Sequence, residues 1–557
     1  TGESEAVEKS TEAVTADAPL GDQSGMAFSG TMVATGTGRG VVVRSGANTE
    51  IGRISGLLAQ TTTLKTPLLE QMDRFARILS IVVIIAGIAI LGGGISGLTA
   101  AYELSKAGYE CTVLEASHRC GGRVMTVRNG DLIDEIGNPQ ICKFDAEPHM
   151  YFNCGAARIP SSHKNVLNYC KELGVDLELF INENKNALVH DPALNGGKPM
   201  RNIDISTNLK GFMAELMFKG FTSSELDQPF SDEEAEKVLS VIRQFGDLSA
   251  DGKYTGSSRS GYVSGGYIDP GVHHEMIDVR DLLKANVGLL RSVLLENEGE
   301  TAPMLMQPVH GMDNIIKGFT RNLKGKIIYH AMVQGVYDHG EMVHVVYNKD
   351  GESHRLEADY VFNCIPSHLM LGIKSNLPEP YLAAMKQIGR GEAYKGAFQM
   401  KERFWEKEAI YGGITWTNQP IRQLWYPFHG LMKQKGVMLA AYDYGGGSGF
   451  MRMTHEERIE AMLAQGEKVH PQYREMAEHG ITIAWHRMNH MLGCSARWGA
   501  MTPEKERHYR TLQQPSGRHY FIGDQVSMHS AWMESAIQSA HWALAHMDQR
   551  VRSEAVA

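Results

Sequence analysis

Three glycines and one acidic residue have the types and the spacing that bind a dinucleotide phosphate: Gly92, Gly94, Gly97 and Glu115. Glycines at these intervals let the backbone approach a pyrophosphate at the N-terminus of a helix. An acidic residue further along accepts hydrogen bonds from a ribose, and Glu115 follows Gly92 by 23 positions. The glycine spacing alone is a weak signal, because glycine-rich turns are common, so the flanking elements decide its meaning.

Those flanking elements are predicted by the same stretch of chain. Residues 88–91 form a short apolar run typical of a buried strand, and a helical apolar pattern follows and ends at Gly108. Residues 111–114 then predict a second strand, which leads directly to Glu115. The order of strand, glycine turn, helix, strand and acid is that of a βαβ unit, so we predict a dinucleotide-binding site.

The residues after Glu115 indicate which dinucleotide binds. Gly121, Gly122 and Arg123 form a Gly-Gly-Arg turn, in which the glycines permit close approach and the guanidinium offers a forked donor to phosphate oxygens. This turn resembles the second half of the fingerprint of the flavin amine-oxidase superfamily. The resemblance implies FAD rather than NAD as the cofactor.

The composition is that of an ordinary globular protein: 557 residues, 43% hydrophobic and 21% charged, which is long enough for two to four domains. The formal net charge of −9 argues against a nucleic-acid partner, which requires a basic face. The seven cysteines have no metal-ligand spacing, so we expect neither a disulfide framework nor a bound metal. The first residues are polar and acidic, unlike a signal peptide, and with the cysteine pattern they favour a cytoplasmic protein.

Residues 1–85 differ from the rest of the chain. They resemble the later half of the actuator domain of a P-type cation-transporting ATPase and the start of the membrane helix after it, which implies a β-rich fragment. In that family the glutamate of the TGES motif positions water for dephosphorylation, and here it is Glu3. The phosphorylated Asp of the family's DKTGT motif is absent from this sequence. We therefore expect a catalytically silent segment, and phosphorylation of the chain by ATP would contradict this.

The junction between the two parts raises the question of a membrane span. Residues 78–102 carry no charge, and roughly 20 apolar residues cross a bilayer. Residues 88–91 are needed as the first strand and Gly92 begins the phosphate turn, so about ten apolar residues remain, too few for a span. We expect no membrane contact, with adhesion through residues 78–91 as the alternative.

From about residue 86 to residue 548 the order of motifs resembles a flavin-dependent L-amino-acid oxidase. The resemblance implies an α/β fold with a discontinuous, Rossmann-like FAD-binding domain and an α+β substrate-binding domain. The FAD-binding segments are predicted at 86–160, 301–365 and 505–550. The substrate-binding segments are predicted at 161–300 and 366–504, and the active site is expected where the domains meet.

The same resemblance implies a set of FAD-binding positions. They are the glycine turn, the acid and the residue after it, the Gly-Gly-Arg turn, a backbone contact to the adenine from residue 333, a Gly-Asp pair and the residues around Trp532. The complete set is Gly92, Gly94, Ile95, Ser96, Gly97, Glu115, Ala116, Gly122, Arg123, Ala157, Arg158, Val333, Gly523, Asp524, Trp532 and Met533.

Two residues are predicted to hold the substrate carboxylate. Arg158 lies in a Gly-x-x-Arg-x-Pro element that matches the family's carboxylate-binding arginine, and a planar guanidinium suits a carboxylate because it binds both oxygens. Tyr442 falls where the family places a hydroxyl on the same carboxylate. The alternatives are a structural arginine that bridges domains and a core aromatic on an apolar strand.

Lys395 and Trp532 complete the predicted catalytic set. Lys395, nine residues before Phe404, matches the family lysine that holds a water near the flavin, although a lone lysine is more often a solvated surface charge. Trp532 matches the aromatic residue beside the flavin, with the Ala531 carbonyl, where the family more often has glycine, receiving the substrate ammonium. Further candidates for pocket walls are Trp498, Trp425 and Tyr426; the histidines at 273, 274 and 310 are assigned no role.

The resemblance implies hydride transfer from Cα of an L-amino acid to flavin N5, which yields a 2-oxo acid and ammonia, and then hydrogen peroxide from O2. A homodimer is left open. The alternatives are a tryptophan 2-monooxygenase, which holds the carboxylate similarly, and a monoamine or polyamine oxidase, which would have no use for Arg158. A membrane-linked redox regulator that uses the ATPase-like segment for docking is a more remote alternative.

Overall fold

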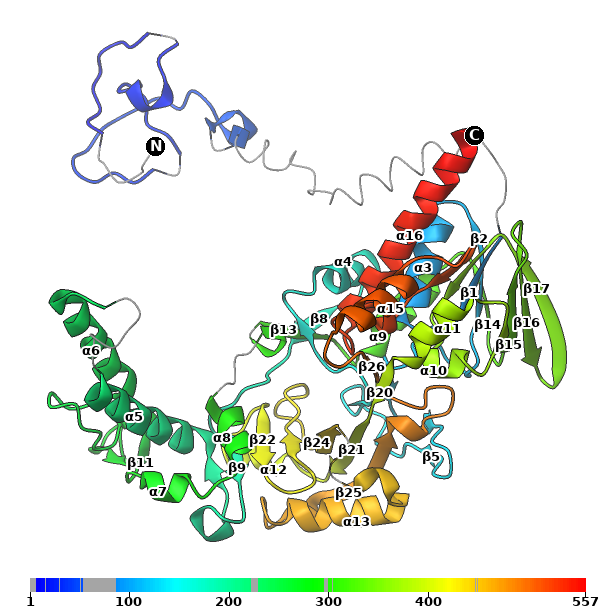
Figure 1. Ribbon diagram of the computed structural model, residues 1–557. Coiled ribbons are helices and arrows are strands. Elements are labelled where there is room, and N and C mark those ends of the chain that lie inside the picture. Colours follow the sequence, from blue (N-terminus) through cyan, green and yellow to red (C-terminus); the bar gives the residue numbers. More distant parts are fainter. Residues whose placement is uncertain are drawn as a thin grey trace. The chain divides into compact units, whose positions relative to one another are not determined.

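The chain divides into two compact units, Thr1–Val83 and Ile84–Ala557, in the computed structural model (Figure 1). The structure describes residues 7–15, 17–29, 31–50, 52–53, 87–221, 229–294, 299–302, 304–445, 447 and 449–556. Each unit is considered by itself.

The described part of the first unit contains two short 3-10 helices, η1 (Leu20–Asp22) and η2 (Gly46–Asn48), and no strand. The prediction of a β-rich fragment is therefore wrong for these residues. A strand needs a neighbouring strand to satisfy its backbone groups, and the described part of this unit supplies none. Its apolar side chains are largely exposed, Met32 at 95%. Glu3 lies outside the described residues.

The second unit is built around a five-stranded parallel sheet with the order β14-β2-β1-β18-β27. Its strands are β1 (Gly87–Leu91), β2 (Glu110–Leu114), β14 (Lys326–Ile328), β18 (Tyr360–Asn363) and β27 (His519–Phe521). In β1, Ile88–Leu91 are all at most 1% exposed, as expected for a parallel strand covered on both faces. The predicted first strand is thereby confirmed, whereas residues 78–86 of the apolar run lie outside the described residues.

Helices cover one face of this sheet and a second sheet covers the other (Figure 1). The helical face is formed by α3 (Ile95–Lys106), α4 (Lys164–Glu172), α9 (Asp313–Asn322) and α16 (Met533–Val556). The opposite face packs on the four-stranded sheet β17-β16-β15-β19, which comprises β15 (Met332–Asp338), β16 (Val343–Lys349), β17 (Glu352–Ala358) and β19 (Lys374–Ser375). Further helices join that side: α10 (Ser367–Met370), α11 (Glu379–Lys386) and α15 (Pro503–Gln513).

A three-stranded sheet contains strands from both sides of the domain boundary predicted at residue 160. Its order is β7-β13-β8, with β7 (Ile159–Pro160), β13 (Leu305–Pro308) and β8 (Leu177–Leu179). Val166 and Tyr169 of α4 pack in the same apolar cluster as α3 and α9. We therefore propose that the first FAD-binding segment extends beyond residue 160 to about residue 179.

A seven-stranded sheet forms the other half of the unit, in the order β10-β9-β22-β23-β24-β21-β25. The strands are β9 (Leu188–His190), β10 (Met200–Arg201), β21 (Ala393–Met400), β22 (Ile414–Thr417), β23 (Gln423–Trp425), β24 (Gly436–Tyr444) and β25 (Ala477–Ala484). Helices α12 (Phe404–Lys407), α13 (His455–Gly466) and α14 (Tyr473–Met476) contribute to its apolar core. All eight residues of β21 are buried, so Lys395, the third residue of this strand, is held inside the protein.

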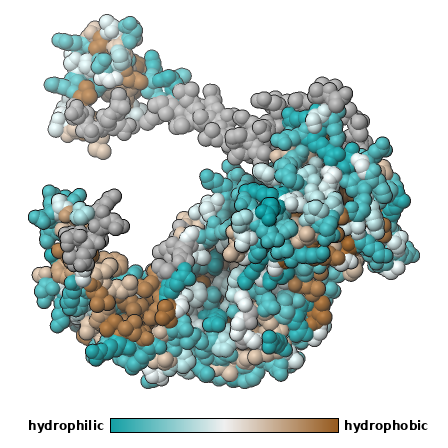
Figure 2. All heavy atoms as spheres, viewed as in Figure 1, coloured by the Kyte–Doolittle hydropathy of each residue, from teal (hydrophilic) through white to brown (hydrophobic). Residues whose placement is uncertain are grey.

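A helical lobe extends from this sheet, formed by α5 (Asn202–Gly220), α6 (Asp232–Gly246), α7 (Val279–Leu282) and α8 (Val287–Leu294). Figure 2 shows apolar side chains gathered on its surface around α5 and α8, where Leu216 is 70% and Val287 80% exposed. None of the described helices of the chain is long and apolar enough to cross a membrane.

Candidate functional site

A cavity of about 650 Å³ extends from the glycine turn after β1 to strands β21 and β24 of the seven-stranded sheet. Its lining includes the ends of β1 and β2, residues 154–158, the first residues of β21, the last residues of β24 and the first residues of α16. This volume is typical of a cofactor or small-molecule site. Chain segments that are hundreds of residues apart therefore meet around one enclosed space.

The glycine turn has the shape of a phosphate cradle. Gly92 has φ of +97°, which favours glycine, and a Cβ on Gly97 would lie 2.2 Å from the Gly92 carbonyl oxygen. Gly94 caps α3 without any side-chain hydrogen bond to the helix, and Gly94, Ile95 and Ser96 line the cavity. The N-terminus of α3, which is the positive end of its dipole, thus borders the cavity, so the turn fits the pyrophosphate of a dinucleotide. Gly97 serves the turn by close packing and does not line the cavity.

Glu115 lies at the cavity edge and also holds the glycine turn in place through a hydrogen bond. Its carboxylate accepts hydrogen bonds from the backbone N–H of Gly93 at 2.7 Å and of Ser117 at 2.8 Å. Burial raises the pKa of Glu115, and these two hydrogen bonds oppose the increase. Each oxygen keeps a second lone pair, so the predicted bond to a ribose hydroxyl remains geometrically available.

Arg123 and Asp524 form a forked ion pair in the wall of the cavity. The Arg123 Nη2 donates to Asp524 Oδ1 at 2.6 Å and its Nη1 to Oδ2 at 2.7 Å, and Nη1 also donates to the Cys494 carbonyl at 2.6 Å. This pairing holds the pKa of Asp524 well below its usual range despite burial. The sequence predicted that the Arg123 guanidinium binds phosphate oxygens, but most of its N–H groups are hydrogen-bonded within the protein. Arg123 thereby links the Gly-Gly-Arg turn to the Gly-Asp pair.

The other predicted FAD-binding positions also meet at the cavity. Its lining includes Ala116, Gly122, Ala157, Val333, Gly523 and Met533.

Arg158 reaches the cavity from the loop after residue 154. Its guanidinium lies over the ring of Trp425, with Cζ 5.2 Å from the ring centroid, and Nη1 donates to Asn182 Oδ1 at 3.0 Å. Burial lowers the pKa of Arg158, and among the described residues no carboxylate forms an ion pair with it. A cavity-lining guanidinium of this kind is available for an anionic group of a ligand.

Lys395 and Tyr442 are brought together by strand pairing, because they lie directly opposite each other on antiparallel β21 and β24. The Lys395 Nζ donates to the carbonyls of Gly155 at 2.6 Å and Asn153 at 3.3 Å. It lies 4.9 Å from the centroid of the Tyr442 ring. Burial lowers the pKa of Lys395 to about 8 and raises that of Tyr442 to about 12. Lys395 is therefore a buried, cavity-lining amine rather than a solvated surface charge.

Trp532 and Ala531 form the cavity wall at the start of α16. Ala531 has φ of +71°, a conformation that favours glycine. The Trp532 ring lies edge-on to His163 at 5.0 Å and parallel to His529 at 6.1 Å between centroids. Burial lowers the pKa of His163.

Two of the three predicted pocket walls lie elsewhere. Trp425 lines the cavity, but Trp498 is buried in the core, where its Nε1 donates to the Gln525 carbonyl at 3.0 Å. Tyr426 lies at a separate, smaller pocket, and its hydroxyl is hydrogen-bonded to Thr415 and His470 at 2.7 Å each. Both predictions were wrong because each residue directly follows the end of a short strand, β26 (Ser495–Arg497) or β23, where the sequence has no signal for the direction of the side chain.

Sequence reasoning missed several cavity-lining residues. Most come from the loop between β25 and β26 (Ser495–Arg497) or follow β18, and the residues in question are Cys364, Ile365, Pro366, Leu369, Tyr444, Trp485, Asn489, His490, Met491, Leu492, Cys494 and Ser530. These residues form no motif in the sequence, because only the packing of separate segments brings them to the cavity.

Comparison with known families agrees with this geometry. The model of a family described as flavin containing amine oxidoreductase matches residues 95–543, and that of the P-type ATPase actuator domain matches residues 1–59. Both resemblances seen in the sequence are thus confirmed.

Among individual proteins, the chain is similar to a flavin-dependent L-tryptophan oxidase of Lentzea aerocolonigenes, 26% identical over 483 residues that cover 81% of this chain and 96% of the relative. It is also 26% identical to an L-amino-acid oxidase of Echis ocellatus over 477 residues, which cover 83% and 89% of the two chains. A solved structure of a redesigned putrescine oxidase superposes with a TM-score of 0.55 at 17% identity, covering 84% of this chain and 99% of that one. The last similarity concerns the fold alone.

Proposed function

The chain belongs to the family of flavin-containing amine oxidoreductases, and we propose that it oxidises L-amino acids. The reaction consumes an L-amino acid, O2 and water and releases a 2-oxo acid, ammonia and hydrogen peroxide. FAD is the cofactor, and when bound it supplies the acceptor for the two electrons that leave the substrate and pass to O2.

The observation that carries this proposal is the position of Arg158. It is a half-buried guanidinium that lines the cavity and has no acidic partner among the described residues. An amine substrate offers nothing to neutralise it, whereas the carboxylate of an amino acid offers both oxygens to the fork. The names of the similar proteins, an L-tryptophan oxidase and an L-amino-acid oxidase, point to the same substrate class.

The surrounding residues would orient this substrate. Tyr442, which lines the same cavity, would donate a hydrogen bond from its hydroxyl to the carboxylate, because its raised pKa keeps the phenol protonated. The Ala531 carbonyl would receive the amino group at the opposite end. Together these contacts fix the Cα–H toward the cofactor and exclude water, which is the protein's share of the rate enhancement.

We further propose that Lys395 holds a water molecule beside the cofactor. Its amine lines the cavity and is held by two backbone carbonyls, which leaves one N–H for a water. No carboxylate or histidine was assigned as a general base, so the substrate amine is expected to enter neutral. The rate should accordingly rise with pH across the titration of that amine.

Two alternatives differ from this proposal in chemistry. A tryptophan 2-monooxygenase would hold the carboxylate in the same way and release an amide and CO2. A monoamine or polyamine oxidase would leave Arg158 without a partner.

The test is anaerobic titration of the purified flavoprotein with L-amino acids, D-amino acids and simple amines. The visible absorbance of the flavin is recorded after each addition. Bleaching by L-amino acids alone is the expected result, and bleaching by amines would overturn the proposal. Product analysis under air then separates a 2-oxo acid with ammonia from an amide with CO2.

A further inference from the structure

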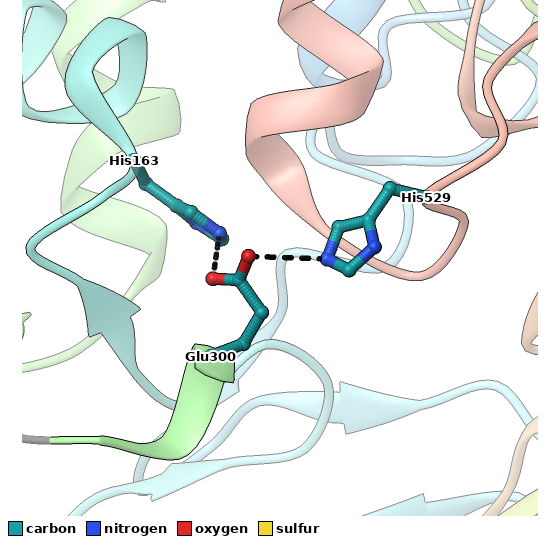
Figure 3. Close-up of side chains that lie close together, drawn as sticks. All are labelled: His163, Glu300 and His529. Atoms are coloured by element: carbon teal, nitrogen blue, oxygen red, sulfur yellow. Dashed lines mark ion pairs between the residues drawn. The ribbon is translucent and has the colours of Figure 1, made fainter. Parts of the chain in front are cut away.

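Three side chains from separate segments converge beside Trp532: His163, Glu300 and His529 (Figure 3). His163 precedes α4, Glu300 lies in the 3-10 helix η7 (Gly299–Thr301), and His529 lies in the loop before α16. The His163 Nε2 is 2.7 Å from Glu300 Oε2, and the His529 Nε2 is 3.4 Å from Glu300 Oε1. One ligand atom of each residue lies within 4.8 Å of those of the other two.

Hydrogen bonding accounts for only part of this arrangement. The His163 side chain is only 3% exposed, and its Nδ1 has no hydrogen-bond partner among the described residues. Its Nε2 meets the Glu300 carboxylate at 2.7 Å, and Glu300 Oε2 also accepts from the Ser162 hydroxyl at 3.1 Å. Buried polar atoms without partners are rare and costly, and one established reason for them is a bound ion.

We propose that His163, Glu300 and His529 bind a divalent cation of the zinc type. Two imidazoles and one carboxylate are a ligand set that zinc uses, with a water in the fourth position. Tetrahedral zinc needs ligand atoms about 3.4 Å apart, which falls within the observed spacing. Water can reach the fourth position, because the side chains of His529 and Glu300 are 57% and 30% exposed. The ligands are spread over 366 positions of the chain (163 to 529), so the sequence contains no metal motif and led us to expect none.

The site is coupled to the cavity through Trp532. Both histidine rings pack on the Trp532 ring, and Trp532 lines the cavity. An ion that fixes both imidazoles also fixes this ring at the start of α16. Zinc should therefore lower the turnover of L-amino acids, because it restricts the movement of the cavity wall. This expectation rests on the proposed function.

The binding test uses the full-length flavoprotein, freed of metal by a chelator and titrated with zinc against a chelating dye. The wild type is compared with His529→Ala and Glu300→Gln, which alter accessible ligands rather than the buried His163. His479→Ala, on an exposed position of β25, is the matched control for the other histidines. We expect one zinc equivalent to bind at least ten times more weakly in both ligand variants and unchanged in the control. Equal binding by all four proteins would overturn the site.

The coupling is tested separately, by L-amino-acid turnover with and without zinc at concentrations that saturate the wild type. Inhibition that is lost in His529→Ala supports it. Zinc binding without any change in turnover would overturn the coupling. Because the titration does not use turnover, failure of the proposed function and failure of the metal site are distinguishable.

Discussion

Arg158, which is half-buried, and Lys395, which is buried, both lie against the ring of Trp425, and their surroundings give them different chemistry. The guanidinium Cζ and the lysine Nζ lie 5.2 and 5.5 Å from that ring centroid. Burial lowers the pKa of both groups, but only that of Lys395 falls near neutrality, to about 8. Arg158 therefore remains a permanent positive charge, whereas Lys395 titrates close to physiological pH.

Replacing Arg158 by methionine should weaken the oxidation of L-amino acids selectively. Loss of a charge-assisted, forked pair costs about 2–3 kcal/mol, so kcat/KM should fall about 100-fold. The measurement is steady-state peroxide production, with a simple amine of the same side chain as the matched control substrate. An equal loss for both substrates would show that Arg158 supports the fold and does not bind the carboxylate.

Replacing Lys395 by methionine should change how stability depends on pH. Because folding lowers the pKa of Lys395 from 10.5 to about 8, the unfolded chain binds more protons than the folded one between these values. The charged lysine thus destabilises the wild type below pH 8, and this penalty, about 3 kcal/mol, disappears as the pH rises to 10.5.

The measurement is the free energy of unfolding of the wild type and of Lys395→Met in urea at pH 7.5 and at pH 10. The stability of the wild type relative to the variant should be greater at pH 10 than at pH 7.5. A difference independent of pH would mean that Lys395 titrates normally.

At the scale of elements, the βαβ unit works as one piece, because α3 packs directly against both the glycine turn and β1. A Cβ on Gly97 would meet the Gly92 oxygen at 2.2 Å and the Ile90 side chain at 3.1 Å. The helix and the phosphate turn can approach this closely only without a side chain at Gly97.

Gly97→Ala should therefore disrupt the phosphate cradle and abolish FAD retention. The measurement is the flavin content per chain after purification, from the ratio of visible to ultraviolet absorbance. Gly220→Ala, at the end of α5, is the control, since a Cβ there has nothing within 4 Å. A Gly97→Ala protein with full flavin content would contradict the cradle.

At the scale of the whole molecule, the chain joins two units that match different family models. All the described residues that line the cavity lie in the second unit, Ile84–Ala557. The first unit matches part of an ATPase domain, and the chain has no DKTGT motif to accept a phosphate.

Deletion of residues 1–83 should leave the flavin spectrum and the turnover of L-amino acids within about two-fold of the full chain, because a unit with its own core folds by itself. The full chain should also incorporate no radioactive phosphate from labelled ATP. Loss of flavin on deletion, or a phosphorylated chain, would contradict a silent first unit.

The sequence by itself predicted the βαβ unit, the flavin cofactor and the carboxylate-binding candidate Arg158, because each is encoded by residues close together in the chain. Glycine spacing, a strand pattern and an acid at a set distance are local features, and local geometry determines them. The sequence also predicted correctly that the N-terminal residues resemble an ATPase fragment, although not that their described part contains no strand.

Only the tertiary structure decided which side chains touch. It paired Arg123 with Asp524, 401 positions away, placed Trp498 in the core instead of the cavity, and gathered His163, Glu300 and His529 into one cluster. Such contacts depend on how sheets and helices pack, which residue spacing does not encode. The physical reason is that a strand pattern specifies which residues are buried, whereas the partner that each side chain meets is set by elements packed from distant parts of the chain.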